Sequence, residues 1–550
     1  MKGKLILIAA AAGLCACGAI TVKETAGPRP AGGGPVKTDA FISNTLVQLL
    51  ENKDKEAVDM ASVLGTPAAD ILGLGSPIGF SLRNRYLNIG VPLSEALSRN
   101  EDPDFRKKLI EEARWERDGE TRAAALISVA RGHDINDLDI FREALINLDP
   151  AVRFGGLESL MVWGHPEKSL QWFAMAQDPR NETEPILRVF AARGLAAGGD
   201  PRGIPALREF LDNGSWLVRA MAGRYLGDFG TADDYDNMVS RLGNEVQNDF
   251  VEAEFCLAAL KLFPQKAAAV DAANRQLQEK VKEEAAPVQN SAIPDGEPVF
   301  QLEALVITAP RVKLSPNAIL DPRIGDTLLR LLATKKNSRP DSQAQMDASV
   351  PNLAKISTLD GYNLKTRYTQ LGFLLTDGLA GSQDLAIDEA LENVATMGKN
   401  VQIQAAAMVA LAYTRQMRYT PVFQQGLTNT NITVRFGALE SLLIEGDAAN
   451  QFMVDTPART DASLVMQVYA AAGLWRMGNI FGREMLLRLY QNADWLTRAM
   501  SAHYLGELGG PSDAGDIYSR LMIQLQNETH PSVKAELVSS LLRLQKIRED

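Results

Sequence analysis

The chain of 550 residues carries 68 acidic and 57 basic side chains, so its formal net charge is −11 at pH 7. A surface this acidic repels nucleic acids and anionic lipid head groups, which excludes a nucleic-acid-binding protein and leaves membrane attachment to a lipid anchor. Hydrophobic residues make up 46% of the chain, enough to build a packed core with only three cysteines.

The amino terminus has the pattern of a secretory signal. Lys2 and Lys4 form a short positive region, and residues 5–14 form an apolar run. That run is too short to span a bilayer as a permanent anchor. We therefore expect residues 1–16 to be a cleaved signal peptide.

The end of this signal resembles the lipobox of bacterial lipoproteins. In that motif an aliphatic residue lies three positions before the modified cysteine, and a small residue directly precedes it; Leu14, Ala16 and Cys17 fit. The resemblance implies a lipid on Cys17, and Gly18 in place of Asp implies sorting to the outer membrane of a didermic bacterium. The alternative is an ordinary signal peptide cleaved near Ala19.

Beyond a Gly- and Pro-rich stretch at 17–37, which we expect to be a flexible tether, the chain contains one module twice. The sequence VRFGGLESL at 152–160 returns as VRFGALESL at 434–442, 282 positions later. Duplication on this scale copies a folded unit, so we predict two modules of the same architecture at 38–264 and 320–550. Other segments repeat at or close to this offset: LRNRY at 82–86 with LKTRY at 364–368, VEAE at 251–254 with VKAE at 533–536, and WLVRAM at 216–221 with WLTRAM at 495–500.

Each copy is itself repetitive, with similar helix openings at intervals in the low thirties. A period in this range suits one pair of antiparallel helices per repeat. Asp149 is placed to cap the helix that begins at Pro150, because its carboxylate can accept amide hydrogens that the first turn leaves unpaired. The openings contain Arg122, Arg153, Arg188 and Arg219 in the first copy and Gln404, Arg435, Gln467 and Arg498 in the second.

At these residues the chain resembles the HEAT-repeat family, including the bacterial HEAT-like repeats first grouped with phycobilisome lyases, over roughly 41–263 and 323–546. The resemblance implies an all-α fold, an α-solenoid of helical hairpins in two tandem modules, which binds other macromolecules. It also implies a ladder of turn Asp and helix Arg residues along the solenoid. Asp149 and Arg153 fit that ladder, whereas the two Gln openings of the second copy depart from it.

Between the modules, residues 265–319 change composition and are expected to form a linker. Residues 265–284 are rich in Ala, Lys, Gln and Glu and can be helical, whereas 285–298 has the prolines of an open chain. Residues 299–310, VFQLEALVITAP, form a β-like run. It is either a hydrophobic linker lying along the solenoid or a segment that resembles the stretch preceding the plug of outer-membrane TonB-dependent receptors.

Residues that recur in both copies are the candidate interaction or packing positions, because repetition within one chain preserves structural and functional side chains alike. Cys256 lies in an apolar run and is predicted to be a small core residue. The candidate positions are Arg153, Trp216 and Arg219 in the first copy and Arg435, Trp495 and Arg498 in the second.

Residues suited to catalysis are sparse. The chain has four histidines, none followed directly by a Glu and no two spaced as zinc ligands on one helix face. It contains no Gly-x-Ser-x-Gly nucleophile elbow and no Gly-Lys-Ser/Thr phosphate loop, so no catalytic, metal or cofactor site is predicted. We therefore expect a non-enzymatic cell-envelope scaffold, anchored through Cys17, whose concave solenoid surfaces bind envelope proteins. The alternative is a cofactor-handling or lyase-like protein of the same repeat class.

Overall fold

The computed structural model of the chain describes residues 38–51, 82, 85–86, 90–100, 102–243, 248–284, 321–333, 364, 367–368, 371, 374–375 and 385–549. Every regular element in these ranges is an α-helix or a short 3-10 helix, which confirms the all-α prediction. The predicted signal peptide, the tether and the β-like run lie outside the described residues.

Helices follow one another through the first module with short connections. They are α1 (Ala40–Glu51), α5 (Gly90–Arg99), α6 (Pro103–Trp115), α7 (Gly119–Ala130), η2 (Ile135–Asp137), α8 (Leu138–Leu145), α9 (Pro150–Trp163), α10 (Pro166–Gln177), α11 (Pro185–Ala197), α12 (Gly203–Phe210), α13 (Trp216–Phe229), α14 (Ala232–Arg241) and α15 (Asp249–Glu284).

The second module repeats this order. Its helices are α16 (Pro322–Ala333), α20 (Leu385–Met397), α21 (Val401–Tyr413), η3 (Met417–Tyr419), α22 (Thr420–Leu427), α23 (Ile432–Glu445), η4 (Ala448–Asn450), α24 (Gln451–Thr460), α25 (Leu464–Arg476), α26 (Ile480–Leu489), α27 (Trp495–Leu508), α28 (Ala514–Asn527) and α29 (Pro531–Glu549).

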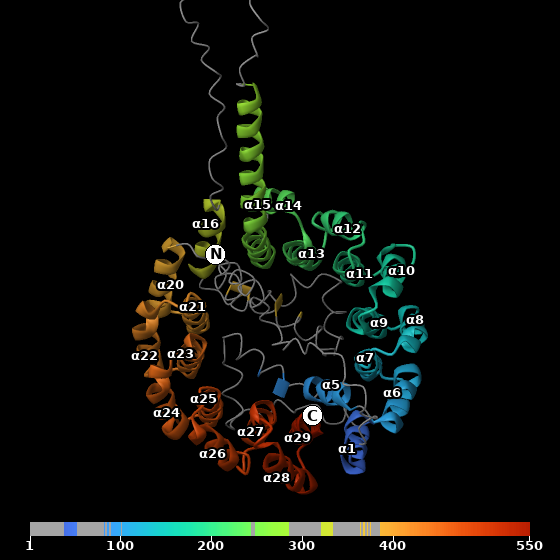
Figure 1. Cartoon of the computed structure of the whole chain (residues 1–550), viewed down its shortest axis with the longest axis vertical. Helices are drawn as coiled ribbons and strands as arrows, with labels where there is room; N and C mark the ends of the chain where they lie inside the picture. The colour runs from blue at the N-terminus through green and yellow to red at the C-terminus, as the bar shows by residue number, and fades with distance from the viewer. Residues whose placement is uncertain are drawn as a thin grey trace, which may run out of the picture.

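The helices form two layers around a closed ring, as Figure 1 shows. The outer layer contains α6, α8, α10, α12 and α14, and their counterparts α20, α22, α24, α26 and α28. The inner layer contains α7, α9, α11 and α13, and their counterparts α21, α23, α25 and α27. Each outer helix packs against the inner helix that follows it, which confirms the predicted solenoid of helical hairpins.

Asp149 caps α9 as its sequence predicts. Its carboxylate accepts the Ala151 amide hydrogen at 2.8 Å, and Pro150 occupies the first turn, where a proline's missing N–H has no cost. Asn431 performs the same task for α23 by accepting the Thr433 amide hydrogen at 2.9 Å. The duplicated helices therefore start at the same place for the same local reason.

Neighbouring inner helices approach each other at glycines. A Cβ atom added to Gly155 on α9 would lie 2.6 Å from the Cβ of Ala123 on α7. At the counterpart positions of the second module, a Cβ on Gly437 would lie 2.7 Å from that of Ala405. These separations are too short for two carbon atoms, so the close packing of the inner layer requires glycine there.

The ring closes because each module contacts the other at both ends. The last helix, α29, packs against α1 and α5 at the start of the chain, and α15 packs against α16. The inner helices of the two modules face each other across the ring (Figure 1). Closure turns the concave sides of both modules toward the same interior.

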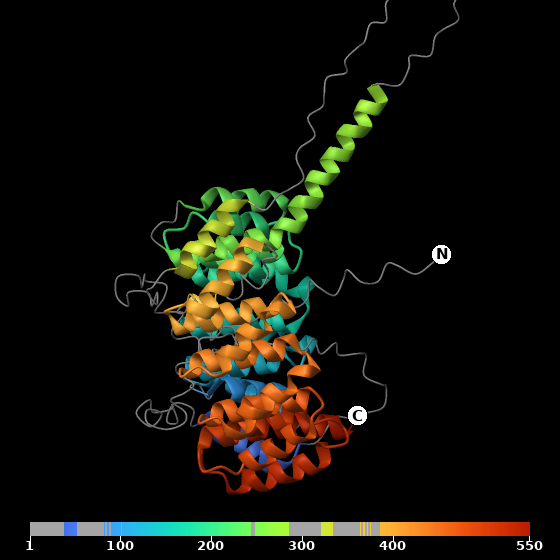
Figure 2. The same cartoon turned by 90° about the vertical axis from the view of Figure 1, so that its left-hand side faces the viewer.

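One helix extends well beyond the ring. The predicted helix at 265–284 is confirmed as the second half of α15, which continues past Pro264 and projects away from the ring (Figure 2). Its first half belongs to the core, where Cys256 is fully buried as expected. Burial raises the pKa of the Cys256 thiol above its ordinary range, so it is a packing residue.

We predict opposite effects for one substitution made at two helical glycines. Gly155→Ala should lower the midpoint of thermal unfolding, because overpacking of this kind costs about 1–3 kcal/mol. Gly515→Ala on α28 should leave the midpoint unchanged or raise it slightly, since a Cβ there meets nothing within 4 Å and alanine favours a helix. Circular dichroism melting curves measure both. An unchanged midpoint in Gly155→Ala would contradict the close approach.

Candidate functional site at the ring joints

The first joint lies where module 1 ends and module 2 begins. Glu254 on α15 is fully buried and accepts a hydrogen bond from Arg367 Nη2 at 2.8 Å. The hydroxyl of Tyr368 donates to the same carboxylate at 3.0 Å. The ring of Tyr368 also lies edge-on to Trp216 of α13, with centroids 6.2 Å apart. This joint therefore combines a buried ion pair with aromatic packing.

The second joint, where module 2 ends on module 1, repeats the ion pair. Arg85 and Glu536 are the counterparts of Arg367 and Glu254, 282 positions away in each case. Arg85 Nη2 donates to Glu536 Oε2 at 2.8 Å, and Glu536 is fully buried. Arg85 also makes a bidentate pair with Glu95 of α5, at 2.9 Å for both contacts. One guanidinium thus joins α5 to α29.

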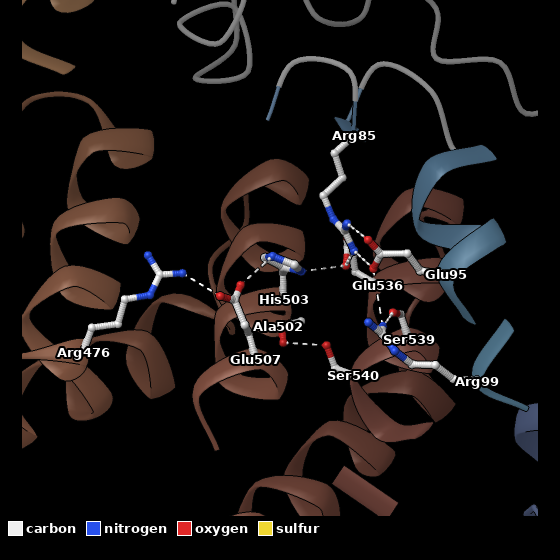
Figure 3. Close-up of polar contacts among 10 residues, drawn as sticks. All are labelled: Arg85, Glu95, Arg99, Arg476, Ala502, His503, Glu507, Glu536, Ser539 and Ser540. Atoms are coloured by element: carbon white, nitrogen blue, oxygen red, sulfur yellow. Dashed lines mark hydrogen bonds and ion pairs between the residues drawn. The ribbon is translucent and has the colours of Figure 1, made fainter. Parts of the chain in front are cut away.

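At the second joint the polar contacts continue along the inner helices (Figure 3). His503 on α27 lies between two carboxylates, with its Nε2 3.1 Å from Glu507 and its Nδ1 3.5 Å from Glu536. Arg476 on α25 donates to Glu507 at 2.6 Å. The network therefore runs from α25 through α27 and α29 to Arg85.

Arg99 secures the other side of this joint. Its Nη1 donates to the Ser539 hydroxyl of α29 at 2.8 Å and lies 3.4 Å from Glu95 (Figure 3). Within module 2, the Ser540 hydroxyl donates to the carbonyl of Ala502 at 2.8 Å, which binds α29 to α27. The last helix is consequently held on both flanks.

The carboxylates of this network remain ionised in the folded ring. Burial alone would raise the pKa of Glu536, but Arg85 and His503 outweigh burial and lower it. Burial is likewise outweighed at Glu95, where Arg85 lowers the pKa well below its usual range. The pKa of Glu507 falls in the same way under the influence of His503 and Arg476. The neighbouring cationic side chains thus stabilise the ionised form of these three carboxylates.

The inner helices at the two joints have different residues at the position of His503. His503 of α27 corresponds to Arg224 of α13, at the 279-residue offset that relates the Trp216 and Trp495 segments. Trp495 stacks on His530 with ring centroids 4.3 Å apart, whereas Trp216 packs on Phe250 at 5.6 Å. Both tryptophans therefore act in packing between successive helices of the inner layer.

The recurring arginines form contacts between successive turns. Arg153 makes a bidentate contact with Glu182 of the following turn, at 2.6 and 3.1 Å, and donates to the Asn147 and Leu148 carbonyls. The expected partner was a turn Asp, but Asp149 is occupied in capping α9. The ladder exists, and its acidic member comes from the next turn.

The second module repeats this contact. Arg435 pairs with Asp461 at 3.0 Å, and Arg498 pairs with Glu528 at 2.9 Å. Burial would raise the pKa of Glu528, but Arg498 and neighbouring donors lower it to about 2. Arg219 donates to the carbonyls of its preceding turn, as Arg153 does. These candidate positions therefore serve the scaffold itself.

Glutamine replaces arginine at two openings of the second module without breaking the stack. The amide of Gln404 donates to the Ala395 carbonyl at 2.8 Å, and that of Gln467 donates to the Asp461 carbonyl at 2.7 Å. Each glutamine thus donates to a backbone carbonyl at or just after the end of the preceding outer helix, without the positive charge of an arginine.

The joint residues were not identified as a site from the sequence. Arg85 and Arg367 lie in the repeated LRNRY and LKTRY segments, and Glu254 and Glu536 lie in the repeated VEAE and VKAE segments. The sequence therefore marks these residues as repeated. Repetition does not indicate that the segments contact each other in the fold. Across the described ranges, no cluster of three or more His, Cys, Asp or Glu residues is arranged to hold a metal ion.

The stack of antiparallel helix pairs, with arginine contacts between successive turns, defines the class as an α-solenoid of HEAT-like hairpins. Residues 179–258, from the turn before α11 to the first half of α15, match the family model described as HEAT repeats. Over these residues the chain is therefore similar to HEAT repeats. No helix of the described residues is both long and apolar enough to cross a bilayer.

No curated protein matches the chain in sequence. Among solved structures, human deoxyhypusine hydroxylase in complex with glycerol is similar over 62% of this chain and 96% of that chain. The sequence identity is 18% and the TM-score is 0.21, and a likeness at this level carries no argument about activity.

We predict that the second joint weakens in acid. In the unfolded chain Glu95, Glu507 and Glu536 return to an ordinary pKa near 4.5, whereas their pKa values in the ring are lower. Their contribution to stability is complete above about pH 4.5 and is lost as the pH falls, because the unfolded chain then binds more protons. The midpoint of thermal unfolding should decrease steadily from pH 4.5 to pH 3.

Two variants test whether the second joint causes this loss of stability at low pH. Glu536→Gln should melt lower than the wild type at pH 7 and lose less stability between pH 4.5 and 3. Glu445→Gln is the control, because burial raises the pKa of Glu445 and its protonation favours the folded state as the pH falls. If Glu536→Gln and the wild type had the same slope with pH, the joint would not be the source.

Proposed function

We propose that the protein is a non-enzymatic, lipid-anchored scaffold of the bacterial cell envelope that holds protein partners on the faces of its ring. The observation that supports this proposal is a pair of large apolar side chains exposed at equivalent places. Trp115 ends α6 with 77% of its surface exposed, and its counterpart Met397 ends α20 with 74% exposed.

A second pair repeats the pattern at the opposite helix ends. Ile135 begins η2, its counterpart Met417 begins η3, and both are exposed. Internal packing gives no reason for keeping apolar side chains at these places, because they lie at the surface. Trp and Met are enriched at protein–protein interfaces, so their recurrence in register supports a contact with another protein.

The ring makes these pairs suitable for simultaneous contacts. The stack continues from one module into the other through both joints. The outer helices of both modules are therefore parallel to one another, with their amino-terminal ends on the same face of the ring. Trp115 and Met397 therefore lie on the same face, on opposite sides of the ring. When a partner is bound at Trp115, its contact with Met397 becomes intramolecular. For a partner long enough to reach both residues, this raises avidity by a factor on the order of a hundred or more.

Anchoring at the envelope rests on the amino-terminal pattern. A lipid on Cys17, following removal of residues 1–16, attaches the ring to the outer membrane through the 17–37 tether. The acidic net charge adds no attraction to anionic lipids, so the anchor itself determines membrane association.

Cys17→Ala tests the anchor. We expect the wild-type protein to partition with membranes and the variant either to be released in soluble form or to accumulate as an uncleaved precursor. Fractionation followed by mass measurement of the mature amino terminus distinguishes these products. Equal membrane association of a cleaved Cys17→Ala protein would contradict lipid anchoring.

A second prediction concerns partner binding. Full-length protein isolated from solubilised envelope should retain a protein partner that the Trp115→Ser, Met397→Ser double variant holds at least about tenfold more weakly, because apolar anchors dominate such contacts. Ile523→Ser on α28 is the matched control, since Ile523 is also an exposed apolar residue but belongs to neither repeated pair. Quantitative mass spectrometry of the eluates measures the ratio. Equal recovery from all three proteins would refute this binding mode.

A further inference from the structure

A row of apolar side chains crosses one face of the second module. Met417, Phe452 and Ile480 lie at the amino-terminal ends of three consecutive outer helices, α22, α24 and α26, and are 69%, 69% and 63% exposed. Consecutive outer helices run parallel, so these ends lie on the same face of the ring. We refer to the three residues as the apolar row.

Hydrogen bonds place the three turns of the row side by side. The carboxylate of Glu445 accepts hydrogen bonds from Thr420 at 3.0 Å and from Asn450 at 3.1 Å, which joins the turns of Met417 and Phe452. The amide of Gln451 donates to the carbonyl of Met477 at 2.9 Å, which joins the turns of Phe452 and Ile480. The three turns that carry the row are therefore neighbours, joined by polar contacts.

Charge is unevenly distributed along this surface. Arg415 and Arg418 flank Met417, and both are exposed. Arg418 Nη2 lies 4.0 Å from Asp388 of α20, whereas Glu445 binds the two side chains above and Asp447 accepts the amide hydrogen of Ala449 at 2.9 Å. The Met417 end of the row consequently carries two exposed guanidinium groups, that of Arg415 and that of Arg418 beside Asp388.

The first module does not have the same surface. The counterparts of Arg415 and Arg418 are His133 and Asn136, and the counterpart of Ile480 is Pro201. Both modules nevertheless have the same fold, and His133 and Arg415 even share a left-handed backbone, with φ of 51° and 53°. The apolar row with its cationic end is thus a specific property of module 2.

We propose that the apolar row binds an amphipathic helix of a partner protein, with carboxylates of that helix over Arg415 and Arg418. An amphipathic helix places its apolar side chains on one face, and residues i, i+7 and i+14 of an α-helix share a face. This inference rests on the proposed scaffold function, to which it adds the chemistry of one partner.

A designed peptide tests the site on the full-length protein. The probe is a labelled helical peptide of alanine and glutamine with leucines seven residues apart and glutamates beside one terminal leucine. Fluorescence anisotropy should show binding that Phe452→Ser weakens at least about tenfold. Ile135→Ser, at the counterpart of Met417 in module 1, should leave the affinity unchanged. Circular dichroism checks that both variants are folded.

Charge reversal separates recognition from general adhesion. Arg415→Glu should weaken binding of the acidic peptide and strengthen binding of the same peptide with lysines in place of its glutamates. Equal binding of a peptide with scrambled leucine positions would overturn the proposal. A dimer of the protein that Phe452→Ser dissociates would also overturn it, because the occupant would then be a second copy of the chain.

The scaffold proposal and the helix-binding proposal can be refuted independently of each other. If the designed peptide does not bind while the Trp115 and Met397 variants still lose their envelope partner, the scaffold stands and the apolar row is not its helix site. If the peptide binds and no envelope partner depends on Trp115 and Met397, the row stands on its own.

Discussion

Two buried ion pairs between the modules, Arg85 with Glu536 and Arg367 with Glu254, are the contacts on which the ring depends. Both glutamates are fully buried, and removing one member of a buried pair costs about 3–5 kcal/mol because the remaining charge has no water around it. In each joint the arginine comes from the other module. The last inner helix of each module is therefore electrostatically complete only when the ring is closed. Open solenoids need terminal repeats with polar outer faces, whereas here each module covers the end of the other.

Duplication explains why closure happens after two modules. A module that carries an arginine near its start and a glutamate near its end can join head to tail with a copy of itself, and such heterologous contacts form either an open filament or a closed ring. Linking two copies in one chain favours the ring, because both joints become intramolecular. Once the two copies are linked in one chain, each can diverge from the other. Arg224 in module 1 and His503 at the corresponding position in module 2 are one such difference.

Local features were predictable from the sequence and distant ones were not. The cap at Asp149, the close approach at Gly155 and the burial of Cys256 depend on neighbours within one or two repeats, which periodicity reveals. Arg85 and Glu536 are 451 residues apart, and repetition marks each of them without indicating that they meet. The family pattern gives Arg153 a place in the ladder without naming its partner, and Glu182 of the following turn makes the contact with its guanidinium.

Closure also decides where binding surfaces can lie. The concave sides face one interior, so the accessible parts of each repeat are the outward side of its outer helix and its two turns, one on each face of the ring. Turn residues at the surface can change without disturbing the core, and there the copies differ most in character: Ile146 and Leu148 are exposed in module 1, where module 2 has Thr428 and Thr430. These residues lie between an outer helix and the next inner helix, whereas the apolar row lies at the other ends of the outer helices. Exposed apolar side chains that are specific to module 1 and to module 2 therefore occupy opposite faces. A ring whose two halves share one fold can in this way present a different surface to each side.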